Sequence, residues 1–407
     1  MLSNVVVVTD FAYIDGGAGK VALTSAEALA TRGYRVILFA AVSPTADAPA
    51  PKGVQLICTG QQDISSDSNR FRSFRQGLWN GKAAREMENL LDGLDPACTI
   101  LHVHNWTRAL SSSPIRVAIQ KGFKVVCTLH DYFSACPNGG LYNFQKHEIC
   151  TLKPMSGACL KTNCDARSYP QKLWRVTRQV IQKEVGGMPG ALAHFIAVSD
   201  FSSRVLRPYL PAEAKVHRVS NPISIHRNAA IDVAGNESFV MVGRLSQEKG
   251  APLFAEAVQS LGFDGVIVGD GVLAETLKAR FPEISYEGWL EPEKVEGVLR
   301  CARCLVLPST WYETQGMVVL EAAALGVPAL VPDTSAARDL VEDGETGLWF
   351  KGGDLSDLQE KMHRIHQDPA LAARLGQAAY EKFWQNPPSI DRHVQELLAV
   401  YQQILAA

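Results

Sequence analysis

Residues 304–328 read CLVLPSTWYETQGMVVLEAAALGVP, which is the pattern of a strand, a polar loop and a helix. The apolar run Leu305–Leu307 ends at Pro308, a residue that cannot donate a hydrogen bond to a strand ladder. A helical pattern then begins at Gly316 and ends at Gly326, and a proline follows two residues later. The sequence therefore predicts a βα unit at this point of the chain.

Two glutamates flank the start of this helix. Glu313 lies in the loop, and Glu321 lies eight positions later, inside the helix and between apolar neighbours. In the simplest interpretation, Glu313 is an ordinary loop residue and Glu321 is a core glutamate with a hydrogen-bonding partner. A carboxylate on an apolar helix is costly to bury, however, which favours a functional role for Glu321. An anion at this helix N-terminus would meet free N–H groups from about Thr314 to Val318, and the two glutamates would then reach different ends of that ligand.

The composition describes an ordinary α/β protein with room for two cores. A chain of 407 residues suggests two domains, and 46% hydrophobic with 20% charged residues is typical of a soluble protein. The net charge of −2 gives no sign of nucleic acid as a partner. The start, MLSNVVVVTDF, lacks the basic and long apolar regions of a signal peptide. We therefore expect a cytoplasmic location and reduced cysteines.

The first 42 residues predict a doubly wound α/β opening. A strand at 5–8 and a Gly-rich turn at 15–19 precede a helix that ends near Gly33, and the next strand covers 35–42. The turn formally fits the dinucleotide fingerprint G-x-G-x-x-A. The second strand is followed by no acidic residue, and Lys20 is followed by Val21. Neither a nicotinamide site nor a Walker loop is therefore favoured.

Polar side chains follow later strands in the same way. Strands at 99–103 and 124–129 precede His104 and His130, at the strand ends where ligand residues collect in parallel sheets. A lone histidine there is more often structural. After a linker at Asn221, a second α/β domain opens with the strand 238–242 and a Gly-bounded loop that carries Arg244 and Lys249. Both cations suit a diphosphate, since Arg binds phosphate in a bidentate manner and Lys acts as a point charge.

Four motifs in this order carry a resemblance. They are TLHD with His130, GRLSQEKG at 243–250, VGDG at 268–271 and E-x7-E from Glu313 to Glu321. Together they resemble the family 4 retaining glycosyltransferases over nearly the whole chain. Thr314 stands where that family usually has glycine, and this substitution bears on how closely the backbone approaches the donor sugar there.

The resemblance implies the GT-B fold, an α/β architecture of two doubly wound, Rossmann-like domains that face each other across a cleft. The expected domains are an acceptor-binding domain at 1–220, a nucleotide-sugar-binding domain at 221–385 and a C-terminal helix at 386–407 that returns to the first domain. The implied catalytic residues are His130, Arg244, Lys249 and Glu313. The implied donor-binding residues are Gly16, Gly17, Gly243, Arg244, Lys249, Glu313, Thr314, Gln315, Gly316, Met317, Val318 and Glu321.

The resemblance also implies a reaction. A sugar, typically a hexose, would pass with retention from a nucleotide diphosphate sugar to a glycan or a lipid-linked acceptor, in cell-surface polysaccharide biosynthesis. The sequence contains no D-x-D, so we expect chemistry that requires no metal or other cofactor. Two alternatives remain open: a GT-B sugar-nucleotide epimerase or hydrolase, and a non-catalytic scaffold that uses a cysteine-rich segment.

That segment covers residues 136–164 and is rich in Gly, Pro, Lys and Asn. Cys136, Cys150, Cys159 and Cys164 are spaced C-x13-C-x8-C-x4-C, unlike the paired C-x2-C of common zinc ribbons. A polar insert without a core of its own needs a staple, and a structural zinc would supply one. The alternatives are four separate reduced thiols, an iron–sulfur cluster or a redox disulfide.

Two basic, aromatic segments stand out in the first half of the chain. Residues 70–85 carry five basic residues, three aromatics and no acids, and residues 167–183 form a second basic helix with a tryptophan. Each is interpreted equally well as a solvated helix face or as a patch for anionic lipid headgroups. The second interpretation places the protein on the inner face of the plasma membrane.

Overall fold

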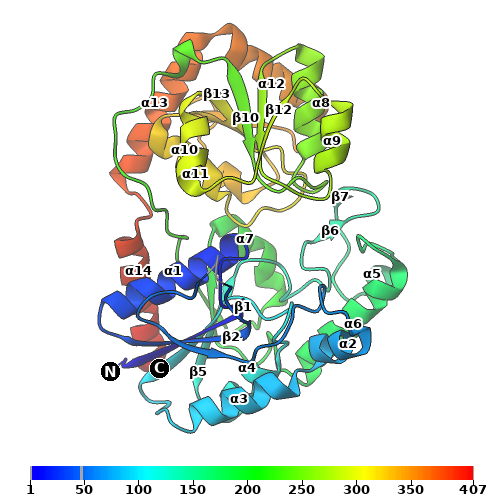
Figure 1. Ribbon diagram of the computed structural model, residues 1–407, viewed down its shortest axis with the longest axis vertical. Helices are drawn as coiled ribbons and strands as arrows, with labels where there is room; N and C mark the ends of the chain where they lie inside the picture. Colours follow the sequence, from blue (N-terminus) through cyan, green and yellow to red (C-terminus); the bar gives the residue numbers. More distant parts are fainter. Residues whose placement is uncertain (1, 46–48, 407) are drawn as a thin grey trace.

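The computed structural model describes residues 2–45 and 49–406. Two parallel sheets, each covered by helices, form an upper and a lower domain (Figure 1). The expected GT-B architecture is confirmed, and both sheets point the carboxyl ends of their strands toward the space between the domains. Parallel strands require crossover connections, which are the helices on the faces of both sheets.

The lower sheet has the strand order β3-β2-β1-β4-β5-β8-β9. Its strands are β1 Asn4–Phe11, β2 Arg35–Val42, β3 Gln55–Cys58, β4 Thr99–Val103, β5 Lys124–Leu129, β8 His194–Ala197 and β9 Lys215–Arg218. Its helices are α1 Gly17–Thr31, α2 Arg70–Leu78, α3 Gly81–Leu91, α4 Ser113–Gln120, α6 Tyr169–Glu184 and α7 Asp200–Leu206. The central strand β1 is buried at seven of its eight positions, as expected for a strand that is covered on both faces.

The upper sheet has the order β12-β11-β10-β13-β14-β15. Its strands are β10 Ser238–Val242, β11 Gly265–Val268, β12 Ser285–Gly288, β13 Ala302–Val306, β14 Ala329–Pro332 and β15 Gly347–Phe350. The helices are α8 Ala251–Leu261, α9 Ala274–Arg280, α10 Pro292–Arg300, α11 Met317–Leu325, α12 Leu355–Gln367 and α13 Pro369–Gln385. The βα unit of residues 304–328 is thus β13 followed by α11, and β13 lies beside β10 at the centre of the sheet.

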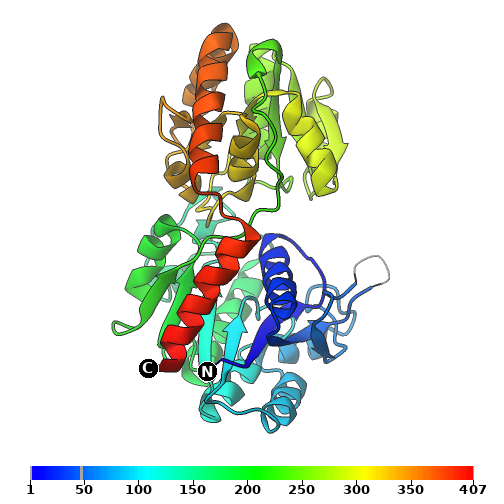
Figure 2. The same cartoon turned by 90° about the vertical axis from the view of Figure 1, so that its left-hand side faces the viewer.

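The C-terminal helix α14, Ile390–Ala406, leaves the upper domain and packs on the lower sheet beside α1 (Figure 2). Its apolar face joins the same core as β1, through Leu397, Tyr401 and Ile404. The two chain segments that connect the domains touch each other, because the amide of Ile223 donates to the carbonyl of Pro388 at 2.9 Å.

Two long helical patterns in the sequence are interrupted in the structure. The sequence at residues 70–94 predicts one helix, but the chain forms α2 and α3, because Trp79 is extended and the side chain of Asn80 caps the second helix at the amide of Ala83. The sequence from about residue 355 to the end of the chain also predicts continuous helix, but the chain forms three helices. Asp368 caps α13 at the amide of Leu371, and α13 ends before the Pro387–Pro388 pair, which cannot continue a helix.

The insert of residues 136–164 forms a small hairpin, β6 Tyr142–Asn143 with β7 Glu148–Ile149, and a short helix, α5 Gly157–Lys161. It extends from the lower domain toward the upper one (Figure 1). The hydroxyl of Tyr142 lies 3.1 Å from that of Thr310, and the backbone of Gly140 packs on the ring of Trp311. The insert therefore contacts the loop that follows β13.

Candidate active site in the interdomain cleft

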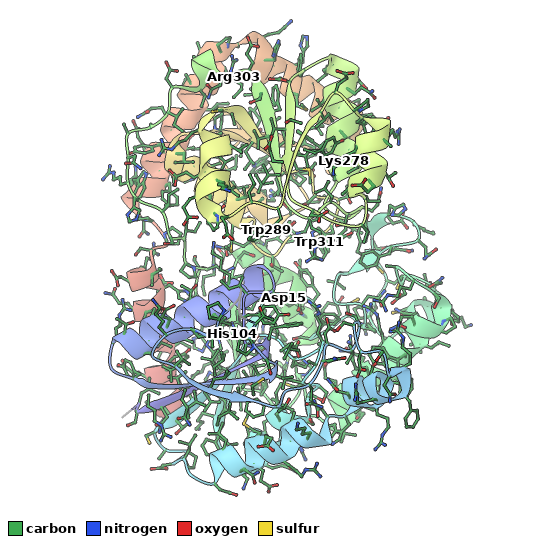
Figure 3. The ribbon with its side chains drawn as sticks, viewed as in Figure 1. Asp15, His104, Lys278, Trp289, Arg303 and Trp311 are labelled. Carbon is green, nitrogen blue, oxygen red and sulfur yellow. The ribbon has the colours of Figure 1, made fainter. Side chains whose placement is uncertain are left out.

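A cleft of about 630 Å³ lies between the carboxyl ends of the two sheets. It gathers His130, Arg244, Lys249, Glu313 and Glu321 with the glycines and loop residues that the sequence selected. In Figure 3, Asp15 and His104 are labelled on the lower side of this region, and Trp289 and Trp311 on the upper side. Every residue predicted for catalysis or donor binding thus lines one cavity.

Glycines let the upper loops approach one another backbone to backbone. A Cβ on Gly250 would lie 1.9 Å from the carbonyl oxygen of Pro308, and a Cβ on Gly269 would lie 2.0 Å from that of Gly243. Gly250 and Gly269 also have φ of +73° and +133°, where side chains are strained. Residues 243–250 therefore lie directly against the loop that follows β13, which brings Lys249 to Glu313.

Lys249 and Glu313 form the central ion pair of the cleft. Lys249 Nζ lies 2.6 Å from Glu313 Oε1 and sits over the ring of Trp311 at 4.8 Å. The hydroxyl of Ser309 donates to the same carboxylate oxygen at 2.8 Å. Burial by itself raises the pKa of Glu313, but the ammonium and the hydrogen bonds outweigh it, so the pKa is lowered. Glu313 is therefore a fixed carboxylate that accepts hydrogen bonds.

Arg244 is exposed, and its guanidinium makes no hydrogen bond or ion pair with another described residue. It lines the cleft opposite the first loop of the lower domain, where Arg108 pairs with Asp15 and Asp63. Gly16, with φ of +113°, precedes the first turn of α1 in this loop. The cleft therefore offers one uncommitted guanidinium from above and a helix N-terminus from below, and both favour an anion.

Glu321 lies one helical turn inside α11 and lines the same cavity. Burial raises its pKa, and the charge of Lys20 on α1 opposes that shift. The first turn of α11 follows Gly316, which has φ of +87° and makes no side-chain cap, so the N–H groups of Met317 and Val318 have no capping side chain. A ligand placed here would satisfy groups that the protein leaves open.

His130 occupies the lower wall, and its carbonyl accepts a 3.1 Å hydrogen bond from the hydroxyl of Thr314. Thr314, which replaces the glycine usual in the resembled family, thus ties the donor loop to the lower domain. Burial lowers the pKa of His130 to about 3, so the ring is neutral near neutral pH. The Asp131 carboxylate accepts from the amide of Phe133 at 2.9 Å, and burial raises its pKa to about 6.

Known families cover both halves of the chain. The family described as "Glycosyltransferase Family 4" matches residues 15–227, and "Glycosyl transferases group 1" matches residues 226–382.

The chain belongs to glycosyltransferase family 4.

Individual relatives each match only part of this family 4 chain. The alpha-D-kanosaminyltransferase of Streptomyces kanamyceticus is 30% identical over 149 residues, which cover 34% of the chain and 38% of that protein. A glycogen synthase of Mycobacterium tuberculosis is 31% identical over 159 residues, which cover 36% of the chain and 38% of that protein. The matched regions thus span well under half of either relative.

Solved structures match over the full length and share the GT-B fold. Sucrose-phosphate synthase of Thermosynechococcus elongatus superposes with a TM-score of 0.72 at 17% identity, and the match covers 99% of each chain. HepE of Anabaena, solved with UDP and glucose, superposes with a TM-score of 0.68 at 15% identity, over 98% of this chain and 100% of that one.

The four cysteines of the insert lie in one region, but a lysine occupies it. The ammonium of Lys172, from α6, is fully buried and donates to Cys164 Sγ at 3.1 Å and Cys159 Sγ at 3.6 Å. Asn138 also donates to Cys164 Sγ, at 3.2 Å. Over residues 2–45 and 49–406, no group of three or more Cys, His, Asp and Glu side chains is arranged to hold a metal ion. The zinc site therefore stays a prediction, and Lys172 of α6 opposes it because its ammonium already contacts two of the four sulfurs.

Several cleft residues were not singled out from the sequence. The carboxylate of Asp10 accepts hydrogen bonds from three consecutive amides, Arg108 to Leu110, and so shapes the lower wall. Trp289, which follows β12, lines the upper rim and is 69% exposed. Asp10 comes shortly after the strand predicted at 5–8, as His104 and His130 come after theirs, so its position was available as a signal. Trp289 lies in a polar stretch with no motif around it.

The titration of Glu321 gives a first prediction. Its carboxyl holds a proton more tightly in the fold than in the unfolded chain, so the ligand-free protein loses stability as the pH rises from about 4.3 through the raised pKa. Glu321→Gln should remove this loss, raise Tm at neutral pH and weaken binding of a nucleoside diphosphate. Thermal unfolding across pH, with and without nucleotide, measures both effects. Glu345→Gln, at an exposed position, is the control, and equal pH profiles for all three proteins would contradict the prediction.

The zinc hypothesis is checked by elemental analysis of the purified protein. Because Lys172 already contacts two of the sulfurs, we expect less than one equivalent of zinc or iron per chain. A stoichiometric metal that is lost in Cys159→Ser would show that Lys172 moves aside and that the four cysteines are ligands after all.

Proposed function

We propose that the protein is a retaining glycosyltransferase that moves a sugar, typically a hexose, from a nucleotide diphosphate sugar to a glycan or a lipid-linked acceptor. The observation that carries the proposal is the convergence of Arg244, Lys249, Glu313 and the open N-terminus of α11 in one cleft. This group combines cations for a leaving diphosphate with carboxylates for hydroxyl groups. Family membership supports the proposal.

The upper wall is assigned to the donor. The diphosphate would lie between Arg244 and Lys249, with the dipole of α11 adding to the positive field. Glu313, held ionised by Lys249, would accept hydrogen bonds from the sugar, and Glu321 would accept from the ribose hydroxyls. HepE of Anabaena was solved with UDP-glucose, which makes uridine nucleotides the first donors to test here.

The site would speed the reaction by stabilising the charges that develop in an oxocarbenium-like transition state. Glu313 is committed to Lys249 and Ser309, so it is poorly placed to attack the sugar as a nucleophile. We propose that the leaving phosphate takes the proton of the acceptor hydroxyl. The sequence has no D-x-D, which supports a mechanism without a bound metal.

A sugar-nucleotide epimerase or hydrolase would use the same donor groups. The two functions differ in their products, since the transferase consumes an acceptor and the epimerase or hydrolase does not. Incubation with a panel of nucleotide sugars, with and without membrane lipid extract, separates them: product that forms only with the extract supports transfer.

Removal of a side-chain cation that binds the diphosphate should slow turnover strongly. Arg244→Ala should lower kcat/KM by about two orders of magnitude, on the scale of losing roughly 3 kcal/mol of transition-state charge stabilisation. Because Arg244 is exposed and unpaired among the described residues, the fold should survive. Lys249→Met should act in the same direction, with circular dichroism as the check on folding. Lys278→Ala, on α9 away from the cleft, is the matched control, and near wild-type kinetics in Arg244→Ala would remove the clamp from the mechanism (Figure 3).

The two basic helices differ in how well they fit the membrane hypothesis. On α6, Lys172 and Arg178 are buried and hold the insert, because their spacing puts them on the inward stripe of the helix. On α2, Phe71 and Phe74 are 71% and 49% exposed beside Arg70 and Arg75.

Helices α2 and α6 pack together, and Leu173 and Val180 of α6 are also exposed (Figure 1). We propose that this surface docks on anionic lipid at the inner face of the plasma membrane, where a lipid-linked acceptor of polysaccharide assembly would be presented. No helix within the described residues is long and apolar enough to cross a bilayer.

Vesicle binding tests the docking surface. The protein should sediment with anionic vesicles in a salt-sensitive way, at roughly 1 kcal/mol per basic residue near the surface. Phe71→Ser with Phe74→Ser should reduce binding, and Arg70→Glu with Arg75→Glu should abolish it. Val272→Ser removes an 89% exposed apolar side chain of the upper domain and is the control. Equal sedimentation with neutral and anionic vesicles would contradict the prediction.

A further inference from the structure

Two histidines meet at the lower wall of the cleft because of strand register. Strands β4 and β5 are parallel neighbours, with Val103 opposite Cys127, and each is followed at its carboxyl end by a histidine. His104 Nδ1 lies 2.9 Å from His130 Nε2, and the rings are nearly parallel, at 22° with centroids 5.1 Å apart. His130 lines the cleft, whereas His104 lies behind it and is 2% exposed.

The protonation of this pair can be worked out from its surroundings. Burial holds the pKa of His104 well below its ordinary range and that of His130 at about 3, so both rings are neutral near neutral pH. One ring must then donate to the other through a single proton. His104 Nε2 is buried and has no partner among the described residues.

The unpartnered nitrogen decides the direction of the bond. If His130 donated, the proton of His104 would sit on Nε2 as a buried orphan N–H, which proteins avoid more strongly than an orphan acceptor. His104 therefore carries its proton on Nδ1 and donates it to His130 Nε2. The proton of His130 is then on Nδ1, a nitrogen that makes no hydrogen bond with another described residue.

We propose that His104 is a positioning residue that fixes His130 in the Nδ1–H tautomer, so that His130 presents an N–H donor to an oxygen of the bound sugar. The inference rests on the proposed function for the role of His130. It adds which ring nitrogen of His130 carries the hydrogen and that this N–H donates toward the sugar. A neutral histidine in water favours the other tautomer, so the fold must impose this one.

The ring of His104 is itself held from behind. Its amide donates to the carbonyl of Val8 at 2.9 Å, and the ring of His102 packs on it with centroids 4.1 Å apart. His102 is fixed at both nitrogens, by the hydroxyls of Tyr401 and Thr128 at 2.6 Å each. The positioning residue is therefore anchored through His102 to the C-terminal helix α14.

The tautomer can be observed directly. Long-range ¹H–¹⁵N NMR spectra of protein labelled with ¹⁵N-histidine distinguish Nδ1–H from Nε2–H, and His130→Gln assigns the signal. We expect the Nδ1–H pattern for His130 in the wild-type protein and in His104→Asn, whose amide N–H replaces the donor. His104→Leu should show the Nε2–H pattern or a mixture. It should also lose about 10- to 100-fold in turnover, the range typical of residues that orient a functional ligand through a hydrogen bond.

The chain offers a matched control. His194 and His217 form a second stacked pair on β8 and β9, with Nδ1 and Nε2 3.2 Å apart and rings at 20°. His194→Leu should change neither the His130 spectrum nor turnover.

The proposal is overturned if wild-type His130 shows the Nε2–H pattern, or if His104→Leu keeps the Nδ1–H pattern. A wild-type turnover in His130→Gln, with the tautomer as expected, would instead remove His130 from the proposed function and leave the positioning role of His104 intact.

Discussion

The ion pair between Lys249 and Glu313 is the interaction on which the upper half of the cleft depends. A carboxylate that is only 8% exposed costs several kcal/mol to desolvate unless a cation and hydrogen bonds compensate. The compensation comes from a loop on the neighbouring strand, and that loop can approach only because Gly250 has no Cβ to meet Pro308. The ion pair therefore depends on three features together: the charge of Lys249, the glycine at position 250, and the strand order that makes β10 and β13 neighbours.

This pairing also prepares the site for a charged ligand. Lys249 is shared between Glu313 and the face of Trp311, so contacts within the protein set its position. Arg244, in contrast, has no partner among the described residues. The cleft thus combines one preset cation with one that is recruited, which limits the ordering that ligand binding requires.

Most of the cleft could be predicted from the sequence, because its residues follow buried strands or lie in loops that glycines delimit. The E-x7-E pair, the GRLSQEKG loop and His130 were found from such positions together with the family resemblance, and residues of all three line one cavity. The environment of the cysteines could not be predicted, since it depends on Lys172, a residue of a helix that looks like a solvated basic face in sequence. The tautomer of His130 depends on the register of β4 against β5, which no local pattern encodes.

The return of α14 to the lower domain limits how the two halves can move. The chain passes between the domains twice, near Ile223 and near Pro388, and a hydrogen bond joins the two passages (Figure 2). A single linker would leave the upper domain free to twist and to swing in any direction. Two joined passages restrict the twist of one domain against the other, and any opening of the cleft must also break the contact of Tyr142 in the insert with Thr310.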